Sequence, residues 1–208
     1  MGRYTGPSCK LCRREGMKLF LKGDRCYMAK CAIETNRPKP GMHGHRRGKM
    51  SDYAEQLREK QRLRRMYGLQ EGQFRSFFEI ASQKKGMTGL TLLQMLEMRL
   101  DNVAYRLGFA PSRKAARQFV KHGHLEVNGR KSAVPSQVLK VGDSVQVREN
   151  EQSRNYARTY VDAAESRGIV PWISFDKEQL KGEVQHAPSR EEIQPLVDEQ
   201  LIVELYSK

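Results

Sequence analysis

Apolar residues recur at helical spacing in the first half of the chain. Phe74, Phe77, Phe78 and Ala81 fall at i, i+3, i+4 and i+7 of a helix expected over 71–84. We expect this stripe to lie in a hydrophobic core rather than to stack on bases. The pattern therefore favours a helix packed against neighbours.

Two further helices flank that stripe. One is expected over 51–68, with Ser51 as its N-cap and Gly68 as its stop. The other begins at Thr88 and carries leucines at helical spacing: Leu92, Leu93, Leu96 and Leu100. Together the three helices predict a small all-helical domain.

The stretch 99–147 changes from helical to alternating periodicity. Its first helix carries apolar residues on one face: Leu100, Val103, Ala104 and Leu107. Its second helix starts after the N-cap Ser112 and stops at Gly123. Apolar and polar residues then alternate up to Asn128-Gly129. This pair favours a tight type I′ hairpin turn because both residues tolerate positive φ. A turn at Gly142-Asp143 leads into a strand at 144–147, so a small antiparallel sheet is expected.

The remaining third predicts one long helix and two more strands. The helix is expected over 153–167, and the strands over 169–175 and 182–185, where they would extend the sheet. A short helical turn is expected over 189–193. The tail from Asp198 to Tyr206 fits either a helix or a strand, and Asp198 as N-cap favours the helix.

The helix after Ser112 has a basic face. Arg113, Arg117 and Lys121 recur every four residues, opposite Ala115 and Phe119, with Ala116 and Val120 on the flank. A charged face is often merely solvated, but this helix contains no acidic residue to pair with its cations. The pattern therefore favours contact with nucleic acid.

This stretch resembles the small RNA-binding module named after ribosomal small-subunit protein four. The matching residues are Arg113, Ala116, Arg117, Phe119, Val120, Gly123, Leu125, Val127, Asn128 and Gly129. Leu125 replaces the usual valine and keeps an apolar strand position. The same module occurs on RNA-modifying enzymes and a tRNA synthetase, so it does not by itself define a function.

Charge is concentrated in the first two thirds of the 208 residues. Lys and Arg number 38 against 24 Asp and Glu, a net charge of +14. Residues 1–65 carry +12, residues 66–149 carry +6, and residues 150–208 carry −4. Such a field favours a polyanionic partner through salt-sensitive phosphate contacts. The chain has no run of 18 apolar residues and no signal peptide, which predicts a cytoplasmic protein without a membrane partner.

Four cysteines lie near the amino end, at Cys9, Cys12, Cys26 and Cys31. Two close pairs separated by a short loop suit one tetrahedral ion, which favours a structural zinc site. Four thiolates can also hold an iron–sulfur cluster, and spacing does not exclude it. The alternatives are free thiols or two disulfides, and disulfides are disfavoured in a reducing compartment.

The stretch 35–50 is rich in Pro, Gly and cations and has no periodicity. It predicts an extended linker that orders on RNA. His43 and His45 are interpreted as polar linker residues, because the four cysteines already satisfy one zinc ion.

The resemblance extends beyond the module to nearly the whole chain. The stretches 1–16, 57–61, 64–68, 99–109 and 198–207 all resemble the family of bacterial ribosomal small-subunit protein four. The resemblance implies a primary binder of small-subunit rRNA that clamps a multi-helix junction in the 5′ domain, nucleates assembly and supports translational accuracy. It also implies contact with ribosomal small-subunit protein five, a position near messenger RNA entry, and no small-molecule substrate.

RNA contacts are expected from three regions. The candidates are Arg3, Arg13, Arg14, Arg46 and Arg47 in the arm and linker, Arg58, Arg62 and Arg65 in the first helix, and Arg106, Arg113, Lys114, Arg117, Lys121, His122, His124, Asn128, Arg130 and Lys131 in the module. A capping or core role is the alternative for His122 and His124. These groups would read phosphates and junction shape, because the deep major groove of A-form RNA resists side-chain readout.

Rival functions fit less well. Residues 150–208 are too short for a catalytic domain, so no enzymatic activity is expected. A DNA-binding regulator would carry Asn or Gln beside Arg on its reading helix, and the basic helices hold few. The alternative kept is a stand-alone RNA-binding regulator or chaperone, including a repressor of the protein's own messenger RNA.

The expected fold is α+β and has three parts. Residues 1–45 form the four-cysteine arm and linker. Residues 46–98 form the helical domain, joined by the tail 196–208. Residues 99–195 form the RNA-binding domain around the module 99–147, in which two helices pack on a small antiparallel sheet.

Overall fold

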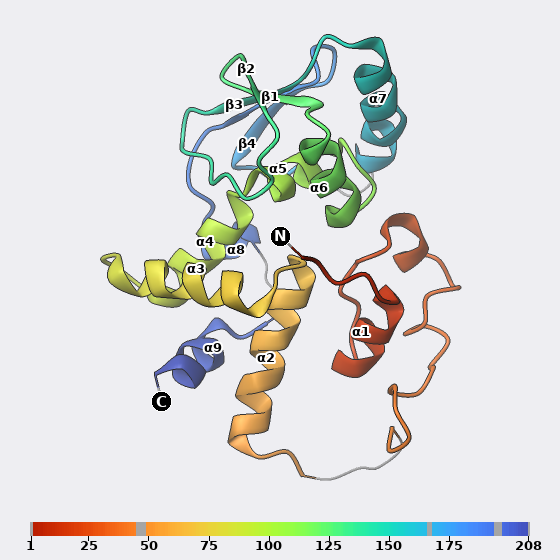
Figure 1. Ribbon diagram of the computed structural model, residues 1–208, viewed down its shortest axis with the longest axis vertical. Helices are drawn as coiled ribbons and strands as arrows, with labels where there is room; N and C mark the ends of the chain where they lie inside the picture. Colours follow the sequence, from red (N-terminus) through yellow and green to blue (C-terminus); the bar gives the residue numbers. More distant parts are fainter. Residues whose placement is uncertain (1, 45–48, 166–167, 194–196, 208) are drawn as a thin grey trace. The chain divides into compact units, whose positions relative to one another are not determined.

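The computed structural model describes residues 2–44, 49–165, 168–193 and 197–207. The chain forms two compact units (Figure 1). Unit 1 comprises Met1–Leu92 and Pro195–Lys208, and unit 2 comprises Leu93–Gln194. The expected boundaries at 45/46 and 195/196 lie outside the described residues, and the structure groups the cysteine arm with the helices in unit 1.

Unit 1 is built from helices. They are α1 (Ser8–Glu15), the 3-10 helix η1 (Gly23–Cys26), α2 (Asp52–Met66), α3 (Glu71–Gln83), the start of α4 (Thr88–Glu97) and α9 (Glu199–Tyr206). Ser51 caps α2 as predicted, because its hydroxyl accepts a hydrogen bond from the Ala54 N–H at 3.3 Å. Asp198 caps α9 in the same way at Gln200, 2.9 Å, so the tail is helical, as its N-cap residue favoured.

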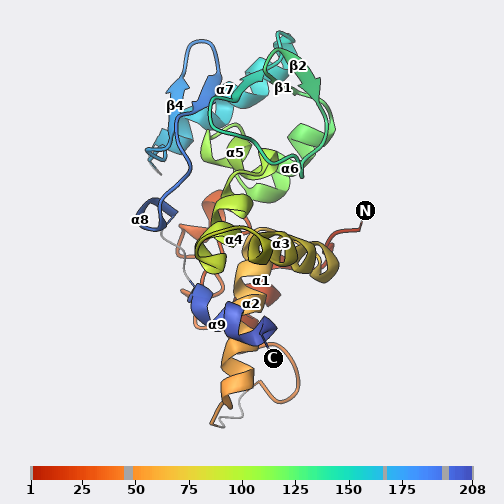
Figure 2. The same cartoon turned by 90° about the vertical axis from the view of Figure 1, so that its left-hand side faces the viewer.

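Helix α9 packs against α2 within unit 1 (Figure 2). The Gln56 amide donates to Glu204 at 3.0 Å, and the ring of Tyr206 stacks on Phe78 with centroids 4.4 Å apart. The expected phenylalanine stripe is therefore core, with Phe74 fully buried. Phe77 is only half-buried, because it lies at the flank of that stripe.

Unit 2 is α+β. Its elements are the end of α4, α5 (Leu100–Arg106), α6 (Arg113–Lys121), β1 (Leu125–Val127), β2 (Arg130–Ser132), β3 (Ser144–Val147), α7 (Glu151–Glu165), β4 (Ile173–Asp176), β5 (Lys181–Val184) and α8 (Arg190–Ile193). The strands form one antiparallel sheet in the order β2-β1-β3-β5-β4. The predicted extension of the module's sheet by the two later strands is thus confirmed.

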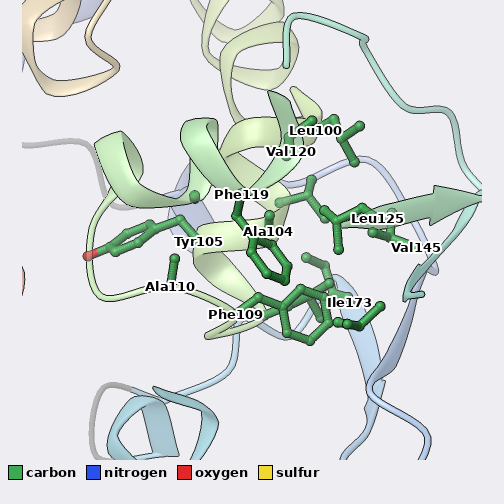
Figure 3. Packing of buried hydrophobic residues seen from close by; sticks show 14 of the residues in the cluster. Leu100, Ala104, Tyr105, Phe109, Ala110, Phe119, Val120, Leu125, Val145 and Ile173 are labelled. Atoms are coloured by element: carbon green, nitrogen blue, oxygen red, sulfur yellow. The ribbon is translucent and has the colours of Figure 1, made fainter. Parts of the chain in front are cut away.

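The β1–β2 hairpin follows the sequence prediction. Asn128 and Gly129 both have positive φ, 51° and 75°, and join Val127 to Arg130. Helices α5 and α6 pack on the sheet through a shared apolar cluster that includes Leu100, Phe119, Leu125 and Val145 (Figure 3). This core fixes the basic helix α6 to a rigid support.

Three details differ from the sequence prediction. In α6 the buried residues are Ala116, Phe119 and Val120, whereas Ala115 is half-buried, because the core sector is rotated from the expected face. Helix α7 begins at Glu151 rather than at residue 153, since the Asn150 side chain accepts from the Gln152 N–H at 3.0 Å. Strand β4 begins at Ile173 rather than at residue 169, because residues 170–173 form a turn around Pro171.

Candidate nucleic-acid interface

The buried carboxylate of Glu97 organises the cations at one end of unit 2. Arg106 donates to it twice, through Nε at 2.9 Å and Nη2 at 2.8 Å. Arg113 Nη2 lies 3.8 Å from the same carboxylate, and Asn102 donates to it at 2.8 Å. Arg113 also donates to Asn102 at 2.7 Å and lies over the ring of Tyr105. Two predicted RNA contacts, Arg106 and Arg113, are therefore held in fixed positions.

Asp101 organises a second pair. The fully buried Arg99 donates to it through Nε at 3.0 Å and Nη2 at 2.8 Å. Arg117, on α6, donates to the same carboxylate at 3.1 Å. Arg99 lies inside the fold, whereas Arg117 remains about one-fifth exposed and keeps N–H donors for another acceptor.

The arginines of the basic helix find acidic partners on neighbouring helices. Helix α6 contains no acid itself, but Glu97 and Asp101 reach its arginines from α4 and α5. The four guanidiniums of Arg99, Arg106, Arg113 and Arg117 face these two carboxylates, which leaves a net charge of +2. The surface is still cationic, and its cations are oriented.

A second group of cations in unit 2 is exposed. Lys121 ends α6, and Arg130 and Lys131 open β2. Among the described residues no carboxylate forms an ion pair with these three side chains. Arg130 and Lys131 line a cavity of about 600 Å³ beside the hairpin. Lys114 is half-buried on α6.

Asn128 is engaged within the fold. Its side-chain oxygen accepts from the Ser144 N–H at 2.8 Å, and its amide donates to Asp143 at 2.8 Å. The predicted RNA-binding residue therefore ties the hairpin turn to β3. Its contact with RNA stays a prediction.

The two histidines after α6 differ in environment. His122 is exposed, whereas His124 is half-buried, stacks on Phe119 and lies 2.8 Å from the Ser153 hydroxyl. Burial lowers the pKa of His124, and the nearby charges of His122 and Arg148 lower it further. A packing role, one of the two alternatives for this residue, is thus observed for His124.

The buried carboxylate of Glu15 plays in unit 1 the part that Glu97 plays in unit 2. Arg58 donates to it at 3.2 Å, and Arg65 donates to the same oxygen. Arg62 pairs with Glu59 and reaches the backbone oxygen of Glu15 at 3.4 Å. Burial lowers the pKa of Arg58, and Glu15 opposes that effect. The three predicted contacts of α2 thus form one anchored row.

Sequence reasoning missed the three organising acids. Glu15 and Glu97 pair with arginines up to 50 residues away in the chain, and Asp101 pairs both with Arg99, two residues away, and with Arg117 on the next helix. An isolated acid among cations carries no periodic signal that marks it as buried. The tertiary fold alone brings these charges together.

The four cysteines of the arm form no disulfide with one another. Cys12, Cys26 and Cys31 are buried and Cys9 is half-buried. The Lys22 N–H donates to the Cys26 sulfur at 3.3 Å. Burial raises the pKa of Cys12 and Cys26, backbone hydrogen bonds oppose it, and the neighbouring thiols raise it further. Within the described ranges, no three His, Cys, Asp or Glu side chains are arranged as a formed metal site.

The remaining predicted contacts in the arm are close to the surface. Arg3 and Arg14 are exposed, and Arg13 donates to the Pro38 carbonyl at 2.9 Å. Arg46, Arg47 and His45 lie outside the described residues. No helix in the described part of the chain has the length and apolar character needed to cross a membrane.

Comparison with known proteins decides the family. Residues 3–97 match the family model described as the ribosomal protein S4/S9 N-terminal domain, and residues 98–145 match the S4 domain. The chain is 55% identical to the small ribosomal subunit protein uS4 of Geobacter sp. (strain M21), with 100% of both chains covered. It is 53% identical to the uS4 protein of Thermus thermophilus, again with 100% of both covered. The chain belongs to the uS4 family.

Membership of the uS4 family confirms the resemblance carried by residues 113–129 and by the stretches outside the module. The uS4 family is not a class of enzymes. The S4 domain match ends at residue 145, so α7, β4 and β5 lie beyond it within unit 2.

Proposed function

We propose that the protein is a structural constituent of the small ribosomal subunit and binds its rRNA. The observation that carries this proposal is the end-to-end similarity to uS4 proteins, whose names identify them as small ribosomal subunit proteins. The anchored arginines supply the physical means. Each guanidinium has five N–H donors, so one that is held by a buried carboxylate keeps donors for a phosphate.

Two groups of cations would contact the RNA in different ways. The anchored rows on α2 and around Glu97 and Asp101 would offer phosphates a fixed spacing. The exposed side chains Lys121, Arg130 and Lys131 would adapt to the RNA that the rows have positioned. Rigid arrays recognise shape, which suits a folded junction better than a base sequence.

The experiment is binding to a transcript of the small-subunit 5′ domain over a range of salt concentrations, followed by sedimentation with small subunits. We expect affinity to fall steeply with salt and the protein to stay on subunits through a high-salt wash. A protein that washes off would instead support the stand-alone RNA regulator, including a repressor of its own messenger RNA. No enzymatic activity is part of the proposal.

We further propose the finer role that the family resemblance implies. The protein would clamp a multi-helix junction of the 5′ domain, nucleate subunit assembly and support translational accuracy. Its protein neighbour would be ribosomal small-subunit protein five, near the entry of messenger RNA. Cross-linking within assembled subunits tests these neighbours, and adducts confined to other proteins would contradict them.

We also propose that Cys9, Cys12, Cys26 and Cys31 hold one structural zinc ion. The donor set fits: four thiols in two close pairs, three of them buried, and a backbone N–H directed at the Cys26 sulfur. When bound, the ion would supply cross-links to a segment with a small apolar cluster, Cys12, Leu19 and Leu21. An iron–sulfur cluster on the same thiols remains the alternative.

Elemental analysis of protein purified without chelator tests the metal. We expect one zinc per chain and, on adding a strong chelator, a lower thermal midpoint with lost amide protection in residues 8–31. Cys26→Ser should do the same, whereas Ser136→Ala, far along the chain, should not. Iron with inorganic sulfide would identify the cluster, and absence of any metal would refute both forms of the site.

A further inference from the structure

A small cavity lies in unit 2 between α6 and the start of α7. Its volume is about 230 Å³, and Phe119, His124 and Tyr156 line it together with His122, Gln118 and Gln152. Sites for drug-sized ligands occupy roughly 300 to 1,000 Å³. This cavity, here called the ring pocket, suits a smaller flat group. None of its lining residues belongs to the Glu97, Asp101 or Glu15 clusters.

Aromatic rings form the wall of the ring pocket. Phe119 stacks with His124, with centroids 4.7 Å apart and planes 21° apart, and with Tyr156, at 5.1 Å and 19°. Tyr160 meets Tyr156 edge-on at 5.0 Å, and His124 is hydrogen-bonded to Ser153, so two of the three rings have a further partner outside the pocket lining. Aromatic side chains are the surfaces on which unpaired nucleobases stack.

Polar groups at the rim could read the edge of a base. Gln118 and Gln152 are exposed, and each amide offers both donors and an acceptor. His122 is also exposed at the rim. The edge of any base presents a mixture of donors and acceptors, so these groups match its chemistry.

The electrostatic surroundings favour a nucleotide over a hydrophobic protein side chain. Among the described residues the pocket lining contains no carboxylate. Arg148 lies beside His124, whose carbonyl accepts from the Arg148 backbone N–H at 3.0 Å, but its side chain pairs with Glu126 at 3.4 Å. Lys121 precedes His122 on the exposed end of α6, and none of the described carboxylates forms an ion pair with it. A base in the pocket would therefore bring its phosphates toward cations.

We propose that the ring pocket receives one unpaired, unstacked nucleobase of the bound RNA, which stacks on Tyr156. This inference rests on the proposed function, since the base belongs to the RNA that the arginine clusters bind. The pocket thus adds a second kind of contact to the phosphate contacts. Only a single-stranded nucleotide can make it. The pocket would therefore help the protein to distinguish a junction, which has unpaired nucleotides, from a plain duplex.

Three variants of the full chain test the proposal on a 5′-domain transcript. Tyr156→Ala should weaken affinity by about 5- to 150-fold, the range expected for losing one base–aromatic stack. Its dependence on salt should change little, because the substitution removes an aromatic ring and no cation. Tyr156→Phe keeps the ring and should bind like the parent protein. Asn155→Ala, the exposed neighbour on α7, is the matched control.

Ultraviolet cross-linking on the unaltered chain gives a second measurement that does not depend on a variant's folding. We expect nucleotide adducts on peptides that contain Tyr156 or His122. If the parent protein binds RNA with the expected salt dependence but Tyr156→Ala binds equally well and no adduct forms, the pocket is overturned and the proposed function stands. If the parent protein does not bind RNA, both fail. A variant that loses only a protein neighbour in assembled subunits also overturns the base assignment.

Discussion

Glu97 and Glu15 each use one buried carboxylate to fix two arginines, in unit 2 and unit 1 respectively. An arginine on a surface normally samples many rotamers, and ordering it on binding costs conformational entropy. A carboxylate that already holds the guanidinium removes part of that cost before RNA arrives. Each acid thus lowers the local positive charge and holds the remaining guanidinium N–H donors in a defined orientation.

The two α6 arginines give the first prediction. Replacing Arg113 and Arg117 together with Ala should weaken RNA affinity and reduce the salt dependence by about two phosphate contacts. The change removes two anchored donors from one helix face. Binding of the variant at several salt concentrations measures both effects, and unchanged affinity with an unchanged slope would refute the placement.

Glu97→Gln separates orientation from charge. Removing a buried partner of Arg106 and Arg113 should destabilise the protein by about 3 kcal/mol. RNA affinity should fall although the net charge rises, because the guanidiniums lose their fixed positions. The control Glu183→Gln raises the charge equally at an exposed site and should not weaken binding. Tighter binding by Glu97→Gln would show that the net positive charge alone, and not the orientation of the arginines, determines RNA affinity.

At the scale of elements, the β1–β2 hairpin depends on its turn. Asn128 adopts positive φ and links the turn to Asp143 and to Ser144, the first residue of β3, through two hydrogen bonds of 2.8 Å. Asn128→Ala should lower the free energy of unfolding by about 1 to 2 kcal/mol.

Arg130 and Lys131 leave that same turn, so the variant should also weaken RNA binding modestly. Asn128→Gly, which tolerates positive φ, should recover part of the stability because it removes the backbone strain but not the lost hydrogen bonds. Chemical denaturation of both variants measures this. Equal losses would mean that the hydrogen bonds, rather than the backbone strain, account for the whole effect.

Local signals made the elements predictable. Ser51, Ser112 and Asp198 cap helices as their residue types predict, and Asn128-Gly129 forms the expected turn. Each of these signals acts within four residues, so it is visible in the chain. Helix α7 begins earlier than the sequence predicts because the Asn150 side chain caps its first turn.

The candidate site was predictable only in part. The cations stand out because they recur along single helices. The acids that anchor them, and the ring pocket that joins α6 to α7, depend on residues that meet only after folding. The face of α6 was also misjudged at Ala115 and Ala116, since periodicity gives a stripe but not its orientation toward the core.

At the scale of the molecule, the positive charge is unequally shared. Unit 1 carries 22 Lys and Arg against 11 Asp and Glu, and unit 2 carries 16 against 13. The net charges are +11 and +3. Non-specific attraction to RNA should therefore come mainly from unit 1, while unit 2 contributes an oriented cluster and a pocket.

Ile202→Ala tests how far the two units are independent. Ile202 is fully buried on α9 within unit 1, and its truncation should cost that unit about 2 to 5 kcal/mol. Hydrogen exchange should show lost protection in residues 52–83 and unchanged protection in residues 100–147. The control is Lys85→Ala, because Lys85 is an exposed side chain of unit 1. Equal loss in both ranges would show that the units unfold together.

The packing of α9 on α2 has a consequence for the order in which the protein can be made. Residues 199–206 leave the synthesising ribosome only after the whole of unit 2, about 100 residues later than the end of the first segment of unit 1. At about 5 to 20 residues per second, that interval lasts roughly 5 to 20 seconds. Throughout it, Phe78 lacks the ring of Tyr206 that covers it in the finished fold. Unit 2 is therefore complete first, and unit 1, which carries the larger net positive charge, is the last to complete its fold.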